Sequence, residues 1–111
     1  MTAKPTELTN YVQFADDRKT LKGNIASISY DVDIAGEAYT SDNPKAPAYR
    51  LFAESPLGRR LEIGGVWKKR NQSGGNYFTL TFNTGYGKLN ANLDRYPGHD
   101  DAELLAVIPW D

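Results

Sequence analysis

The fold is decided by the stretch Leu61–Arg70 (LEIGGVWKKR) and by the stretch Asn76–Phe82 (NYFTLTF) that follows it. Both contain β-branched and aromatic residues, and apolar positions recur along them at a spacing of two, which is typical of strands with one buried face. The intervening segment Asn71–Gly75 (NQSGG) consists of turn-forming residues and ends on two glycines. The two stretches are therefore predicted to form a β-hairpin.

The same pattern continues outward from the hairpin, with turn residues every eight to twelve positions, and no segment has a convincing helical period. One long segment, Leu21–Ile34, has its apolar residues on odd numbers at first and on even numbers later. We expect a β-bulge near Ala26–Ser27 that keeps both sets on the core. The predicted strands are Tyr11–Ala15, Leu21–Ile34, Tyr49–Ala53, Leu61–Arg70, Asn76–Phe82, Leu89–Leu93 and Leu104–Ile108.

The expected architecture is an all-β, single-domain antiparallel barrel or strongly bent sheet of about seven strands, because closure removes exposed strand edges. The domain is expected to span residues 11–111, after a loose leader over residues 1–10. Strict alternation along the hairpin predicts a core-facing set of Leu61, Ile63, Trp67, Phe78, Leu80 and Phe82. On this basis Trp67 is a core residue rather than a platform for stacking, and Val66 faces outward. The Gly64–Gly65 pair is expected to allow a sharp bend.

Composition excludes several classes of protein. The chain has 111 residues, a formal net charge of −1, no cysteine and one histidine. Disulfides, thiolate zinc sites and a cysteine nucleophile are therefore impossible. The longest apolar run, Leu104–Ile108, is far below the roughly 20 residues of a membrane helix. The first ten residues hold no apolar stretch, so a cytoplasmic protein is expected.

No enzyme is expected either. His99 stands beside Asp100 and Asp101, but it has no second histidine to work with. Asp31 and Asp33 share the polar phase of a strand, which a hydrated outer face explains. We therefore predict no catalytic residue, no metal site and no cofactor.

The order of motifs resembles a known family. The motifs are Leu21–Ile25 (LKGNI), Asn43–Leu51 (NPKAPAYRL), Glu62–Lys69 (EIGGVWKK), Asn76–Phe82 (NYFTLTF), Leu89–Leu93 (LNANL) and Trp110. Together they resemble the small bacterial proteins grouped as domain of unknown function number seven hundred and thirty-six. The resemblance implies a single β-rich domain and an origin in plasmids or integrative elements. It implies no activity and no catalytic residues.

Cations and rings near the hairpin lead to the first functional hypothesis. Five of the thirteen Lys and Arg residues fall between Arg59 and Arg70, and the hairpin is expected to fold them toward one region. Cations that follow a phosphate backbone, interleaved with rings on which bases stack, are typical of single-stranded nucleic-acid binding. The predicted contact residues are Arg50, Phe52, Arg59, Arg60, Lys68, Arg70 and Tyr77. A purely solvated outer face, on which the cations only prevent edge-to-edge pairing, remains open.

Clustered carboxylates lead to an alternative from another class. An acidic surface imitates the charge of nucleic acid and so can occupy a basic groove of a host protein. The alternative function is an inhibitor of a host defence system, of the anti-CRISPR or anti-restriction type. Its predicted contact residues are Asp31, Asp33, Asp94, Asp100 and Asp101.

Overall fold

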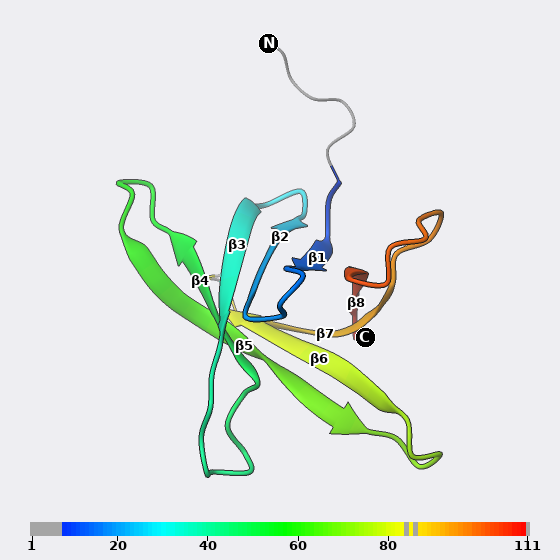
Figure 1. Cartoon of the computed structure of the whole chain (residues 1–111). Coiled ribbons are helices and arrows are strands. Elements are labelled where there is room, and N and C mark those ends of the chain that lie inside the picture. The colour runs from blue at the N-terminus through cyan, green and yellow to red at the C-terminus, as the bar shows by residue number, and fades with distance from the viewer. Residues whose placement is uncertain (1–7, 84, 86, 111) are drawn as a thin grey trace.

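Eight antiparallel strands close into a barrel in the computed structural model, which describes residues 8–83, 85 and 87–110 (Figure 1). Each strand pairs with the next along the chain, and the last pairs with the first. The strands are β1 (Tyr11–Phe14), β2 (Thr20–Ala26), β3 (Asp31–Ala38), β4 (Tyr49–Glu54), β5 (Arg60–Arg70), β6 (Asn76–Asn83), β7 (Lys88–Arg95) and β8 (Leu104–Pro109). The predicted all-β antiparallel barrel is confirmed, with one strand more than expected. Over the described ranges there is no helix, and hence none long and apolar enough to cross a membrane.

The additional strand arises where a bulge was predicted. Residues 21–34 form two strands instead of one bent strand, because a tight turn separates β2 from β3. The N–H of Ser27 donates to the carbonyl of Tyr30 at 2.6 Å, and the Ser27 hydroxyl accepts from the N–H of Ser29 at 3.1 Å. Ile28, predicted to face the core, lies at the tip of this turn and is fully exposed. The prediction of a β-bulge at Ala26–Ser27 was therefore wrong. A turn that Ser27 stabilises separates the two strands, and across it the apolar positions change from odd to even numbers.

The predicted leader lies mostly outside the described residues. Its last residue is tied to the barrel: the side-chain amide of Asn10 donates to the carbonyl of Ala26 at 3.2 Å and accepts from its N–H at 3.1 Å. The Asn10 side chain thus continues the β1–β2 pairing, because its amide bonds the Ala26 backbone as a peptide group of a strand would. Its φ of 54° is a left-handed conformation that asparagine tolerates.

One apolar core fills the barrel. Its fully buried side chains of largest volume are Phe82, Ile25, Leu51, Leu80, Val12 and Val66. The alternation predicted for β6 is confirmed, because Leu80 and Phe82 are buried and Phe78 packs against them. Phe78 also lies 5.4 Å, between ring centroids, from Phe14 on β1. The interior is thus closed by contacts between residues more than sixty positions apart.

The alternation predicted for β5 is wrong over half of the strand. Residue pairing between β4 and β5 runs from Leu51–Gly64 directly to Phe52–Glu62, so Ile63 is an extra residue in β5. An extra residue on one strand is a β-bulge, and it exchanges inward and outward positions beyond it. Val66 is consequently buried, and Trp67 lies on the outer face. Leu61, another predicted core residue, is 51% exposed.

Close backbone contact explains the glycine next to this bulge. A Cβ at Gly64 would lie 1.8 Å from the carbonyl oxygen of Thr81 on β6, a distance no structure tolerates. At the Gly64–Gly65 pair the backbone of β5 therefore lies very close to the backbones of β4 and β6. The observed feature is close backbone approach, one of the roles glycine has in strands, and the sharp bend expected at this pair stays a prediction.

The first prediction concerns Gly64. Gly64→Ala should lower the free energy of unfolding by about 3 kcal/mol, since β5 and β6 must separate to admit the methyl group. Urea unfolding followed by circular dichroism measures this change. The matched control is Gly75→Ala, where the nearest atom, 3.3 Å away, belongs to the Asn71 side chain and can move. Equal midpoints for the two variants would contradict the close-contact explanation.

Candidate nucleic-acid interface

The structure divides the predicted nucleic-acid residues between two places. Arg59 lies in the β4–β5 turn and Arg60 at the start of β5, whereas Lys68 and Arg70 lie at its far end. Ten residue steps of strand span roughly 30 Å. Figure 1 shows β5 as one long strand that leaves the barrel wall as a protruding hairpin with β6. The expected convergence of these cations was therefore wrong.

At the first place Arg50 and Arg60 are already paired, whereas Arg59 belongs to none of the ion pairs among the described residues. Arg50 forms a bidentate ion pair with Glu62, at 2.6 and 3.0 Å, and Arg60 pairs with Glu37 at 2.5 Å. The Arg60 guanidinium carbon also lies 3.7 Å from the centre of the Phe52 ring and covers one face of it. Because Arg50 and Arg60 each have a carboxylate and the Phe52 ring has a cation, these three side chains have little left to offer a phosphate or a base.

The pKa values at this cluster follow from the Arg50–Glu62 contact. The hydrogen bond from Arg50 lowers the pKa of the Glu62 carboxyl below its ordinary value, and the same bond raises the pKa of Arg50. Both side chains lie at the surface, where solvent screens such pairs. The pair consequently orients the two side chains without a large effect on stability.

The second place is the protruding end of the β5–β6 hairpin. Lys68, Lys69 and Arg70 are exposed there, and none belongs to the ion pairs found among the described residues. Tyr77 faces Lys69 across the hairpin and is 38% exposed. From Ile63 to Leu93 the sequence contains four cations and no carboxylate. The hairpin therefore carries positive charge that no ion pair among the described residues neutralises.

Trp67 lies on the outer wall beside these cations. Its indole N–H donates to the carbonyl of Lys45 at 3.0 Å, which ties it to the β3–β4 loop. The ring also passes over Gly65, where an added Cβ would lie 3.2 Å from Trp67 Cη2 and 2.9 Å from Pro47. The indole is thus held beside the loop, and its surface is partly open to solvent.

A second indole stands on the same face. The backbone N–H of Trp110 donates to the carbonyl of Asn90, and its indole N–H donates to Asn92 Oδ1 at 2.9 Å. Trp110 is 55% exposed. Trp67 pairs with Thr79, and Thr79 pairs with Asn92. Trp67 therefore begins a row across β5, β6 and β7. The last residue of that row, Asn92, accepts from the indole of Trp110, whose own backbone lies beside Asn90.

We call the following residues the hairpin face: Trp67, Lys68, Lys69, Arg70, Tyr77 and Trp110. Trp67, Lys69 and Tyr77 point to the outer side of the hairpin, whereas Lys68 and Arg70 alternate with them and point to the side of Phe78. Three of them, Lys68, Arg70 and Tyr77, belong to the predicted set. Lys69 and Trp67 were missed because alternation alone was applied across the bulge, and Trp110 was missed because it lies after β8, outside the hairpin. The absence of carboxylates over residues 63–93 was the signal in the sequence that identifies this region.

The predicted acidic surface is also divided. Asp31 and Asp33 lie together on β3, where the Asn24 side-chain amide donates to both, at 2.8 and 3.2 Å. Asp94 occupies the same row of the wall as Asp33 but is four strands away, roughly 19 Å along the surface. Asp100 and Asp101 lie in the β7–β8 loop. Only the Asp31–Asp33 pair is thus brought together.

The β7–β8 loop is organised by internal contacts. Asp101 accepts hydrogen bonds from the N–H of Glu103 and from the Gln13 side chain, and these bonds lower its pKa. The His99 ring lies edge-on to Tyr96, with 5.3 Å between ring centroids. No group of three or more His, Cys, Asp or Glu side chains in the described part of the chain has an arrangement suited to a metal ion.

Comparison with known proteins assigns the chain to a family. The model of the family described as Protein of unknown function (DUF736) matches residues 10–106. The chain belongs to this family. No curated protein and no solved structure matches it. The family match extends across nearly the entire barrel, from the residue that precedes β1 into β8, so it includes both tryptophan-bearing β5 and the acidic β3.

The second prediction concerns the Arg50–Glu62 pair. Arg50→Gln should raise the pKa of Glu62 toward its ordinary value, because the bond that stabilises the carboxylate is lost. Any stability gained from the lowered pKa is present at neutral pH and is lost as the pH falls through that pKa. Carbon-detected NMR titration of the carboxyl groups measures the shift. Asp101, remote from Arg50, is the internal control and should titrate unchanged.

Proposed function

We propose that this protein is a non-enzymatic, single-stranded nucleic-acid-binding module that uses the hairpin face. The observation that carries the proposal is the protruding end of the β5–β6 hairpin. Within a segment without carboxylates it carries exposed cations that join none of the ion pairs among the described residues, together with Tyr77, and the exposed Trp110 lies on the neighbouring wall. The proposed setting is the cytoplasm, as an accessory protein of a mobile genetic element. The element is part of the proposal because the sequence resemblance implies it.

Two kinds of side chain contribute to the proposed binding. Lys68, Lys69 and Arg70 attract phosphates, and the counterions they release favour binding at low salt. The rings of Tyr77 and Trp110 offer apolar faces on which unpaired bases stack, at about 1–3 kcal/mol per base. Since every base has such a face, the binding is expected to depend little on sequence.

A depression next to the hairpin adds a place for a base. It has a volume of about 300 Å³ and lies at the end of the barrel beneath Tyr77. Phe14 and Phe78 contribute its aromatic lining, Arg18 and Arg95 line it as well, and Asp94 brings one carboxylate to it. Arg18 is held by a bidentate bond to Glu103. A base that leaves the stack over Tyr77 thus meets further rings within the same surface.

The third prediction concerns salt and charge. If about four phosphates are contacted, the logarithm of the affinity for an oligothymidylate should fall with the logarithm of salt concentration with a slope near −3. Lys68→Gln combined with Arg70→Gln should weaken binding roughly tenfold and reduce the magnitude of the slope by about one or more. Fluorescence anisotropy of a labelled oligonucleotide measures both quantities.

The control removes the same charge from the paired cations of β4 and β5. Arg50→Gln combined with Arg60→Gln should leave the affinity within about twofold, because both cations are already paired with carboxylates. The proposal would be contradicted by an affinity that does not change with salt concentration, or by equal losses of affinity in the two double variants.

The fourth prediction concerns stacking. Trp110→Ala should raise the dissociation constant for an oligothymidylate by about five- to a hundredfold, the range that the loss of one stacked base implies. Leu57→Ala is the matched control, since Leu57 is an exposed apolar residue in the β4–β5 turn, outside the hairpin face. Titration calorimetry compares them. Identical affinities for the two variants would remove Trp110 from the interface.

A further inference from the structure

The barrel wall has a seam between β3 and β4. Pairing between these strands covers only Ala35–Ala38 against Tyr49–Phe52. β3 begins four residues earlier, at Asp31, and β4 continues to Glu54. Across the seam the two strands therefore face each other without ladder hydrogen bonds, whereas Asp31–Ile34 remain paired with β2 on their other side.

The alternation of backbone groups shows what the seam exposes. The N–H of Ala38 donates to Lys19, on the β2 side, and the N–H of Tyr39 donates to Ala48, on the β4 side. In an antiparallel strand the N–H and C=O of one residue point the same way, and successive residues alternate. Counting back from Tyr39, the backbone groups of Asp33 and Asp31 point into the seam. Beyond the last β3–β4 pair they have no strand partner there.

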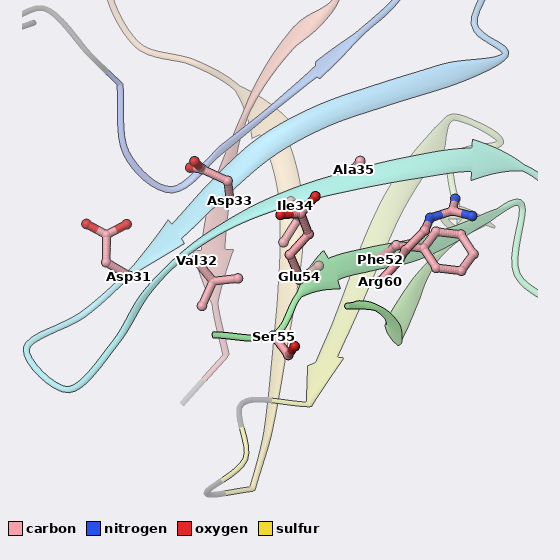
Figure 2. A pocket seen from close by; sticks show the side chains of 10 residues that line it. Asp31, Val32, Asp33, Ile34, Ala35, Phe52, Glu54, Ser55 and Arg60 are labelled. Carbon is pink, nitrogen blue, oxygen red and sulfur yellow. The ribbon is translucent and has the colours of Figure 1, made fainter. Parts of the chain in front are cut away.

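The seam is also a groove with an apolar side. It has a volume of about 570 Å³, within the usual range of ligand sites. Figure 2 shows Val32 and Ile34 directed toward the side of Glu54 and Ser55, with Asp31 and Asp33 directed the other way. Ile34 belongs to the core, and Val32 packs against it. An extended chain placed in the seam therefore meets Val32 on its inner face and carboxylates on its outer face. Arg60, which also lines the groove, is paired with Glu37.

The carboxylates are available to a cation. Both Asp31 and Asp33 accept from the single side-chain nitrogen of Asn24, which is 7% exposed. Neither Asp belongs to any of the three ion pairs formed within the described ranges. Lys22 of β2 lines the same stretch of surface without such a pair. Two neighbouring carboxylates that share one amide nitrogen retain free lone pairs for a positively charged partner.

We propose that the seam takes up an extended segment of a partner protein as an added β-strand, with basic and apolar residues alternating along that segment. The free N–H and C=O groups of Asp31 and Asp33 would bond its backbone, as in other cases of strand addition. Its Lys or Arg side chains lie beside the two carboxylates, and its aliphatic side chains lie beside Val32 and Ile34.

The two turns at the mouth of the seam support a protein partner. The β2–β3 and β4–β5 turns lie at the same end of the barrel, on either side of β3 and β4 (Figure 1). Their tips carry Ile28, which is 105% exposed, and Leu57, which is 82% exposed. Aliphatic tips beside a strand edge suit a polypeptide, whereas the carboxylates repel the phosphates of a nucleic acid.

The test uses the full chain and a fluorescein-labelled peptide, Gly-Lys-Val-Lys-Val-Lys-Gly, followed by fluorescence anisotropy. Asp31→Asn combined with Asp33→Asn should weaken binding about tenfold or more, since charge is lost while the side-chain oxygens still accept from Asn24. Asp94→Asn combined with Asp100→Asn removes the same charge outside the seam and should leave the affinity unchanged. A peptide with Glu in place of Lys should not bind.

Backbone pairing is tested separately from charge. Asp33→Pro removes an N–H that points into the seam and so costs the barrel no ladder bond. It should weaken binding beyond Asp33→Asn, and unfolding midpoints confirm that both variants fold. Two peptides, N-methylated at alternate residues in the two possible phases, should differ, with at least one losing binding. On peptide addition, amide hydrogen exchange at Asp31 and Asp33 should slow.

Three results would overturn the proposal. The first is no binding of the unmodified peptide. The second is equal binding of both methylated peptides and the unmodified one, which would leave only charge attraction. The third is an oligonucleotide, in place of the peptide, slowing exchange at Asp31 and Asp33, which would assign the seam to nucleic acid.

Discussion

The one-residue shift between β4 and β5 controls which side chains enter the barrel. Side chains alternate with a period of two, so the extra residue Ile63 exchanges the faces of everything that follows it in β5. Val66 fills the core as a result, and Trp67 is left on the wall. The shift is possible because Gly64 lets the β6 backbone approach to a distance that a side chain would forbid. The core and the hairpin face both depend on this passage.

The same rule explains what the sequence could and could not predict. Alternation placed Phe78, Leu80 and Phe82 correctly because β6 has no irregularity. It failed at Trp67, since two adjacent glycines indicate a distortion but not which residue is the extra one. It failed at Ile28 as well, because apolar spacing continues through a turn that Ser27 stabilises by hydrogen bonds. The all-β antiparallel class followed from turn spacing, which such local errors do not disturb, whereas the choice between a closed barrel and a bent sheet needed the strand pairing.

The candidate site was predicted only in part for a different reason, namely that the ion-pair partners of the cations are not apparent from the sequence. The neutralisation of Arg50 and Arg60 depends on Glu62 and Glu37, which reach them only through the pairing of three strands. Spacing along the chain contains no such information, so cations that are paired and cations that are free look alike. Lys68 and Arg70 differ from them because no carboxylate occurs in the long segment around them. A local depletion of one charge sign is therefore a better guide than a local excess of the other.

A net charge of −1 does not weigh against binding of nucleic acid by this barrel. At physiological ionic strength, exposed charges are screened over about 8 Å. The barrel measures 32 Å across its shorter axes. A phosphate beside Lys69 is therefore governed by the hairpin and hardly senses Asp31 or Asp33. The two walls act as separate electrostatic surfaces, and one domain can present a basic face and an acidic seam together.

Both surfaces originate near Phe52. The β3–β4 ladder ends at this residue, and the register of β4 against β5 changes at this residue. A bulge increases the local twist of its strand, which accounts for β4 leaving β3 where β5 gains its extra residue. The insertion that turns Trp67 outward thus also opens the seam. A regular wall would have sealed the strand edge and buried the indole, so a single irregularity in β5 connects the two surfaces for which we propose partners.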